Sequence, residues 1–133
     1  MTPPPAKTVL IIDDDEDDRF FMNQAFKTDS PHTHVYLAAG GQQALDLLCS
    51  AQPLPHVILL DLNMPAMNGF EVLKHLKQSA LYQPIPVIIL TTSDSFHDRE
   101  QARQLDAQGF ITKPTSYNDL YSIAKWIRLT LDK

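Results

Sequence analysis

Six consecutive acidic residues follow an apolar run near the start of the chain. The apolar run occupies residues 9–12, and the acidic segment occupies residues 13–18. Adjacent carboxylates repel one another, and burial favours the neutral acid unless a cation or a helix N-terminus compensates the charge. A second apolar run, residues 57–60, is followed directly by Asp61. This pattern predicts that two strands deliver their carboxylates to one place, where a positive group is also present.

The carboxylates of Asp13, Asp14 and Asp61 have the chemistry of a magnesium site. Carboxylate oxygens are the ligands that a hard divalent cation such as Mg²⁺ prefers, and no cysteine or clustered histidine accompanies them. Two further apolar runs lead to Thr91 and Lys113, which add a hydroxyl and an ammonium. Such groups position a phosphoryl group during its transfer, and a carboxylate can be the nucleophile. The residues therefore indicate phosphoryl transfer to Asp61, with Thr91 and Lys113 bonding the phosphoryl oxygens.

Short apolar runs, typical of strands, alternate with helical patterns five times along the chain. These strands and helices would position the residues named above. The expected strands are residues 8–13, 34–38, 57–61, 86–91 and 109–112. The expected helices are residues 17–27, 42–50, 69–78, 96–105 and 116–131. This alternation predicts an α/β fold, a doubly wound (βα)5 flavodoxin-like three-layer sandwich whose parallel sheet has the order 2-1-3-4-5. The carboxyl ends of the strands would then gather the acidic, hydroxyl and lysine side chains at one edge.

Composition limits the remaining possibilities. With 133 residues, 44% of them hydrophobic, and a net charge of −5, the chain suits one soluble domain, residues 8–133, after a disordered or extended tail, residues 1–7. The 11 basic residues form no run, which argues against nucleic acid as a partner. No apolar stretch approaches the roughly 18 residues of a membrane span, and the N-terminus lacks a signal-peptide core. We therefore expect a cytoplasmic protein with no membrane partner.

Four short motifs follow the expected strands in a fixed order. They are Asp13-Asp14, Asp61-Leu62-Asn63-Met64-Pro65 with Asn68-Gly69, Thr91-Thr92 and Lys113-Pro114. The set resembles the receiver domain of bacterial two-component response regulators, and most of all the stand-alone, single-domain receivers that partner phytochrome-type histidine kinases. The resemblance covers nearly the whole chain from Thr8 to the last helix.

The resemblance implies a role for each acidic residue. Asp61 would accept a phosphoryl group from the phosphohistidine of a histidine kinase or a phosphotransfer protein. Asp14 and Asp61 would bind Mg²⁺ through their side chains, Asn63 through its backbone carbonyl, and Asp13 through a water molecule. The protein would catalyse only its own phosphorylation and dephosphorylation and would not be an enzyme with a separate substrate.

Further roles implied by the resemblance concern the phosphoryl group after transfer. Thr91 and Lys113 would bind it, and the Lys113–Pro114 bond would be cis, a form that X–Pro bonds adopt at modest cost. Asn63 and Ser93 occupy positions that influence the lifetime of the phosphoryl group in this family.

Switching in receivers couples Thr91 to an aromatic residue on the fifth strand, and Phe110 stands where Tyr is common. Because Phe lacks the hydroxyl, a change in packing is expected in place of a simple rotamer switch. The fourth helix, fifth strand and fifth helix would form the surface that contacts a downstream protein. Trp126 and Leu129 lie off the apolar stripe of the last helix and could contact another protein. A second copy of the chain is therefore a further candidate partner, which would form a homodimer.

Several simpler interpretations stand beside these. Residues 15–18 are expected to be a solvated face in the first turn of a helix. Cys49, the single cysteine, lies among leucines and is expected to be a buried, inert thiol.

A haloacid-dehalogenase-like phosphatase also uses an Asp nucleophile and Mg²⁺, but it requires a second Asp two residues later, where this chain has Asn63. A receiver-like scaffold that is never phosphorylated is the third alternative, and the intact acid, hydroxyl and lysine set argues against it.

Overall fold

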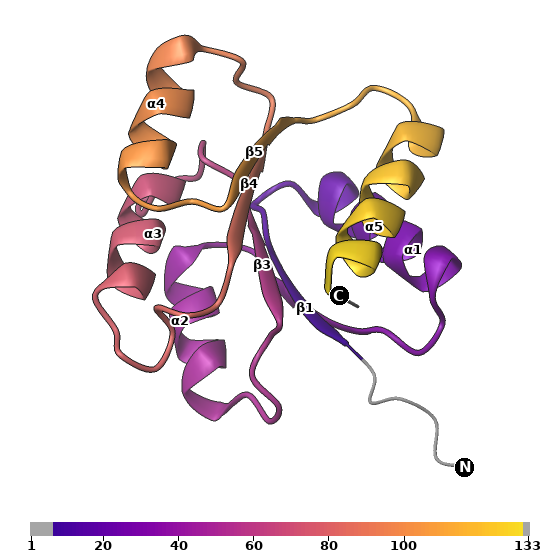
Figure 1. The fold of residues 1–133 in the computed structure, drawn as a ribbon, viewed down its shortest axis with the longest axis horizontal. Coiled ribbons are helices and arrows are strands. Elements are labelled where there is room, and N and C mark those ends of the chain that lie inside the picture. Colours follow the sequence, from indigo (N-terminus) through magenta and orange to yellow (C-terminus); the bar gives the residue numbers. More distant parts are fainter. Residues whose placement is uncertain (1–6, 132–133) are drawn as a thin grey trace.

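Strand and helix alternate five times in the computed structural model, which describes residues 7–131 (Figure 1). The strands are β1 (Thr8–Ile12), β2 (His34–Ala38), β3 (Val57–Leu60), β4 (Val87–Thr91) and β5 (Gly109–Thr112). The helices are α1 (Glu16–Asp29), α2 (Gly41–Ser50), α3 (Gly69–Lys77), α4 (Phe96–Gln104) and α5 (Tyr117–Leu131). Every predicted element is present, with ends displaced by at most two residues. The predicted tail lies outside the described residues, except for Lys7.

The five strands form one parallel sheet of order β2-β1-β3-β4-β5, so the predicted topology is confirmed. Figure 1 shows α1 and α5 on one face of the sheet and α2, α3 and α4 on the other. Successive side chains of a strand point to opposite faces. Leu10 and Ile12 therefore join the core under α2 to α4, while Val9 and Ile11 join the core under α1 and α5. Burial on both faces explains the unbroken apolar runs.

Helix α1 begins within the acidic segment, one residue earlier than predicted. Asp15 is its N-cap, and its carboxylate accepts a hydrogen bond from the backbone N–H of Asp18 at 2.9 Å. Acidic side chains in the first turn interact favourably with the positive end of the helix dipole. The acidic segment therefore forms the loop after β1 and the first turn of α1.

The exposure of Cys49 differs from its prediction, whereas that of Trp126 and Leu129 agrees. Cys49 is exposed, so the prediction of a buried thiol is wrong. The reason is the phase of α2, which turns Ala44 and Leu48 toward the core and Cys49 away from it. Trp126 and Leu129 are exposed, as their position off the apolar stripe of α5 predicts.

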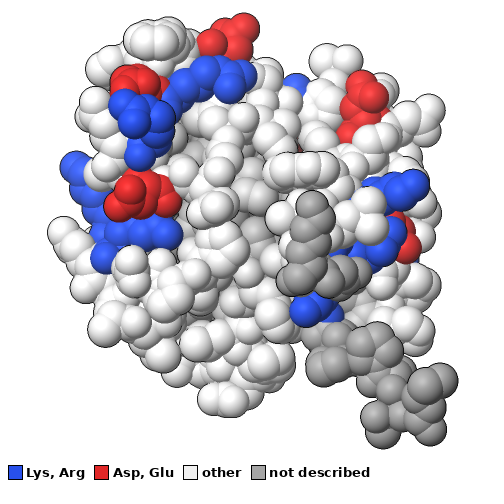
Figure 2. Space-filling model, viewed as in Figure 1, with Lys and Arg blue, Asp and Glu red and all other residues white. Residues whose placement is uncertain are grey.

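Charged side chains of both signs are mixed on the face drawn in Figure 2, where lysine and arginine lie beside aspartate and glutamate. In the part of the chain that the structure describes, no helix is long and apolar enough to cross a membrane.

Candidate functional site

The carboxyl ends of β1, β3, β4 and β5 bring four chemically active residues to one edge of the sheet. Asp13, Asp61 and Thr91 are buried there, with 5%, 6% and 0% of their surfaces exposed. Backbone hydrogen bonds fix neighbouring strand ends together: Asp61 N–H donates to the Ile12 carbonyl at 3.0 Å, and Lys113 N–H donates to the Thr91 carbonyl at 2.7 Å. The strand order thus places the predicted residues together.

Three carboxylates converge at this edge. One oxygen from each of Asp13, Asp14 and Asp61 lies within 4.8 Å of the others. Asp14 is exposed, whereas the other two are buried, so the cluster opens to solvent on one side. All three donors are oxygens, which fits a hard divalent cation such as Mg²⁺ and not a thiolate-bound or imidazole-bound metal. Asn63 is exposed in the loop after β3, two residues beyond Asp61.

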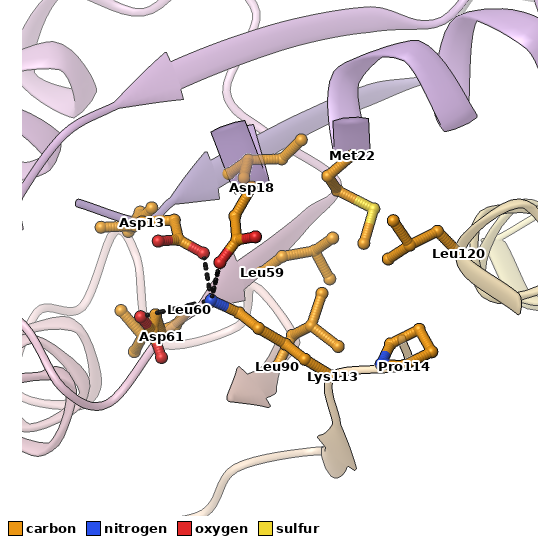
Figure 3. Close-up of a pocket in the computed structure, with 12 residues that line it drawn as sticks. Asp13, Asp18, Met22, Leu59, Leu60, Asp61, Leu90, Lys113, Pro114 and Leu120 are labelled. Carbon is orange, nitrogen blue, oxygen red and sulfur yellow. Dashed lines mark hydrogen bonds and ion pairs between the residues drawn. The ribbon is translucent and has the colours of Figure 1, made fainter. Parts of the chain in front are cut away.

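Lys113 is the cation that balances these charges (Figure 3). Its Nζ lies 2.6 Å from Asp13 Oδ2, 2.7 Å from Asp18 Oδ2 and 3.5 Å from Asp61 Oδ2. Burial lowers the pKa of Lys113, but its hydrogen bonds to Asp13 and Asp18 and the charges of Asp13 and Asp61 outweigh burial and raise the pKa above its ordinary value. The ammonium is therefore charged at neutral pH.

Asp18 was not among the predicted site residues. The prediction that residues 15–18 form only a solvated face is wrong for Asp18, because its carboxylate reaches Lys113 across 95 positions of sequence. Only the packing of α1 against the loop after β5 brings the two side chains together. A partial signal existed in the sequence, since six adjacent carboxylates favour a nearby cation.

Burial also affects the carboxyl group of Asp13. Burial raises the pKa of Asp13, and the hydrogen bonds from Lys113 and from the backbone N–H of Asp15 only partly oppose this rise. Because the side chain of Asp13 is itself buried, the neighbouring Lys113 ammonium stabilises its ionised form.

The side chain of Asp61 is held in one orientation by its own loop. Oδ1 accepts a hydrogen bond from the backbone N–H of Leu62 at 2.8 Å, which directs Oδ2 toward Lys113. Helix α3 begins immediately beside this loop, and Gly69 N–H donates to the Leu62 carbonyl at 2.9 Å. A Cβ atom at Gly69 would lie only 2.3 Å from the Asp61 carbonyl oxygen. The absence of a side chain at Gly69 therefore allows α3 to pack against the backbone of Asp61.

The loop between β4 and α4 is held by a small hydrogen-bond network. Ser93 N–H donates to Thr91 Oγ1 at 3.4 Å, and the Ser93 hydroxyl donates to Asp98 Oδ2 at 2.6 Å. Ser95 is the N-cap of α4, because its hydroxyl accepts a hydrogen bond from Asp98 N–H. Asp98 is a neighbour of the site that the sequence did not indicate.

Phe110 on β5 is partly buried and packs on the core under α4. The guanidinium carbon of Arg99 lies 4.7 Å from the centre of its ring, and Arg99 also donates to Thr112 Oγ1 at 3.2 Å. A cation over an aromatic face contributes about 0.5–1 kcal/mol at an exposed site. The guanidinium thus supplies a polar contact at β5 that the ring cannot make by itself.

The Lys113–Pro114 peptide bond is trans, so the prediction of a cis bond is wrong. In residues 7–131 the cis peptide bond is Gln52–Pro53. The trans form is the lower-energy isomer of an X–Pro bond by about 0.5–1 kcal/mol.

The fold and this site together define a class of protein. It is a doubly wound α/β domain whose sheet edge carries an acidic cluster, a buried hydroxyl and a bridging lysine. The family model described as the response regulator receiver domain matches residues 9–125. The chain belongs to this family, the receiver domains of two-component systems.

Individual relatives agree with this membership. The chain is 34% identical over 102 residues to response regulator Rre1 of Synechocystis sp. and 39% identical over 75 residues to response regulator Rcp1 of the same organism. These matches cover 77% and 56% of this chain, but only 43% and 51% of the relatives, so the chain spans about half the length of the curated relatives.

Solved structures are similar over nearly the entire chain. The phosphorylated cyanobacterial phytochrome response regulator RcpA superposes with a TM-score of 0.87 at 27% identity, covering 96% of this chain and 95% of RcpA. The Mn²⁺-bound form of Rcp1 superposes with a TM-score of 0.80 at 30% identity, covering 92% and 91%.

Proposed function

We propose that Asp61 accepts a phosphoryl group from a histidine kinase or a histidine phosphotransfer protein in a Mg²⁺-dependent reaction. The observation that carries this proposal is the convergence of Asp13, Asp14 and Asp61 within 4.8 Å, with the Lys113 ammonium beside them. Membership of the receiver family and the similarity to a phosphorylated regulator and a Mn²⁺-bound regulator support it. The receiver domain would occupy residues 8–133.

The proposed metal ligands are the side chains of Asp14 and Asp61, the backbone carbonyl of Asn63 and, through water, Asp13. The bound Mg²⁺ supplies positive charge that offsets the charges of the acceptor and the phosphoryl group. Asp61 is suited to the nucleophilic role because the hydrogen bond from Leu62 holds its side chain in a fixed orientation.

The transfer itself exchanges one bond to phosphorus for another. A carboxylate oxygen of Asp61 attacks the phosphorus atom of the phosphohistidine, and an O–P bond forms while the N–P bond breaks. The imidazole nitrogen leaves with the electron pair. Lys113 pairs with one phosphoryl oxygen and Thr91 donates its hydroxyl to another, so that both stabilise the developing charge.

The signal would leave the site through contacts on α4, β5 and α5. Thr91 moves toward the phosphoryl group, and Phe110 responds by a change in packing in which Arg99 keeps a polar contact on β5. Asn63 and Ser93 would influence the lifetime of the phosphoryl group. The exposed Trp126 on α5 is available for a downstream protein or a second copy of the chain.

Labelling with a small phosphoryl donor tests this proposal. Incubation with acetyl phosphate and Mg²⁺ should add one phosphoryl group to the intact protein, as measured by mass spectrometry, and EDTA should prevent the addition. Asp61→Asn, which keeps the shape of the side chain and removes the nucleophilic charge, should show no addition.

Two results would favour the alternatives. Steady turnover of a phosphate ester by the protein would favour a haloacid-dehalogenase-like phosphatase. An unchanged mass of the wild-type protein with acetyl phosphate and with phosphoramidate would favour a receiver-like scaffold and would contradict the proposal.

A further inference from the structure

The ammonium of Lys113 is shared among three carboxylates before any phosphoryl group arrives. A lysine has three N–H donors, and Asp13, Asp18 and Asp61 each lie within ion-pair distance of them. The separation from Asp61 is the longest, 3.5 Å, compared with 2.7 Å from Asp18. A phosphoryl oxygen on Asp61 must therefore compete for a cation that already has a closer partner.

Asp18 differs from the other two carboxylates in its position. Its side chain is 44% exposed, whereas those of Asp13 and Asp61 are 8% exposed. Figure 3 shows that it approaches Lys113 from α1, on a different side from Asp61. Its backbone is fixed by the N-cap hydrogen bond to Asp15. Asp18 therefore holds a negative charge at the exposed rim of the pocket that contains the acceptor.

The charge of Asp18 is also separate from the carboxylates that would bind the metal. Among the described residues, the group that could hold a metal consists of Asp13, Asp14 and Asp61, without Asp18. A divalent cation at those three carboxylates would not contact Asp18, whose carboxylate would stay paired with Lys113. An anion that enters the site therefore meets the negative charge of Asp18, which a metal bound by the other three carboxylates would not neutralise.

We propose that Asp18 determines the selectivity of the site for its phosphoryl donor, by holding Lys113 and by repelling small anionic donors that diffuse in from solvent. This inference rests on the proposed phosphorylation of Asp61. With acetyl phosphate, an oxygen of Asp61 forms the new bond to phosphorus while the bond between phosphorus and the acetate oxygen breaks. Acetate leaves with the electron pair, so no proton transfer is needed.

Neutralising Asp18 should accelerate this reaction. Asp18→Asn keeps an oxygen that can accept the Lys113 hydrogen bond but removes the negative charge. We expect the second-order rate constant for phosphorylation by acetyl phosphate to rise about three- to tenfold at low ionic strength. A unit charge a few ångströms from the reacting group changes the activation barrier enough, in a partly hydrated site, to alter the rate by about this factor. The measurement is the initial rate of mass gain.

Two matched variants separate this effect from a general change in charge or helix stability. Asp17→Asn removes a neighbouring carboxylate from the same helical turn, so it should leave the rate within about twofold of wild type. Asp18→Glu restores the charge and should return the rate toward the wild-type value. If Asp18→Asn does not fold, as judged by circular dichroism, Asp18→Ser carries the same prediction.

Two conditions distinguish an electrostatic role from a structural one. The acceleration should shrink as ionic strength rises, because a partly exposed charge is screened by salt. It should also be smaller with phosphoramidate, which carries less negative charge than acetyl phosphate at neutral pH. A structural role would give the same ratio under all of these conditions.

The outcomes identify which proposal fails. If wild-type protein is not phosphorylated, the proposed function fails. If wild-type protein is phosphorylated but the Asp18→Asn rate equals or falls below the rates of wild type and Asp17→Asn, the assignment of Asp18 is overturned while the proposed function stands.

Discussion

Replacing Lys113 with Met should lower the free energy of unfolding by about 2–3 kcal/mol in a buffer without divalent cations. The substitution keeps much of the apolar stem of the side chain, which lies along a pocket lined by Leu59, Leu90 and Pro114. It removes the ammonium that contacts the buried carboxylates of Asp13 and Asp61. Two nearly buried negative charges would then keep their backbone hydrogen bonds but lose the ammonium that pairs with them.

The pH and metal dependence of this loss follow from the same charges. Burial already raises the pKa of Asp13, and loss of the ammonium would raise it further. Protonation of Asp13 removes part of the repulsion, so the deficit of Lys113→Met relative to wild type should be present at neutral pH and shrink as the pH falls through the raised pKa of Asp13. Added Mg²⁺ should also reduce it, because a cation bound only by the folded protein stabilises that state.

Chemical denaturation with and without Mg²⁺ measures these changes. Lys74→Met, the same substitution at an exposed lysine of α3, is the control and should change the free energy of unfolding by less than about 0.5 kcal/mol. Equal stability of Lys113→Met and Lys74→Met, or a deficit that is the same at all pH values, would contradict the view that Lys113 balances the acidic cluster.

Replacing Gly69 with Ala should disturb both stability and phosphorylation. The added Cβ would meet the Asp61 carbonyl oxygen at 2.3 Å and the Leu62 Cα at 2.8 Å, and both are backbone atoms that cannot rotate away. Overpacking of this kind costs about 1–3 kcal/mol. The displaced atoms belong to the acceptor residue and to Leu62, whose N–H orients the acceptor side chain. Because reacting groups must be held in place closely, the rate of phosphorylation by acetyl phosphate should fall at least about tenfold.

Gly40 provides the matched control for this substitution. It precedes α2, its backbone is extended, and an added Cβ would have no atom within 4 Å. Gly40→Ala should therefore change stability by less than about 1 kcal/mol and leave the phosphorylation rate near that of wild type. If Gly69→Ala behaved like Gly40→Ala in both measurements, close packing of α3 on the loop of Asp61 would have no functional importance.

The parts of the fold that could be predicted depend on local signals. Apolar runs such as residues 57–60 identify strands because both faces of a parallel sheet are buried. The position of Asp61 directly after such a run places it at the carboxyl end of β3, and the same reasoning places Asp13, Thr91 and Lys113. The sequence therefore predicted that these four residues come together at one edge of the sheet, but it did not predict that Asp18 joins them.

The parts that could not be predicted depend on side-chain contacts between distant segments. Asp18 and Lys113 meet only because α1 packs beside the loop after β5, and a shift of one residue in the helix start changes which carboxylate faces that loop. Arg99 reaches the ring of Phe110 for a similar reason, since the phase of α4 decides which side chain covers β5. The exposure of Cys49 also depends on helix phase, which a short run of leucines leaves ambiguous.

The most direct test of the account is the identity of the phosphorylated residue. Protein labelled with acetyl phosphate and Mg²⁺ can be treated with borohydride, which reduces an acyl phosphate to an alcohol and marks the acceptor permanently. Peptide mapping by mass spectrometry should then find the reduced side chain at position 61 and at no other acidic position. A mark at Asp13, Asp14 or Asp18, or none in protein that has gained the phosphoryl mass, would contradict the assignment of Asp61 as the acceptor.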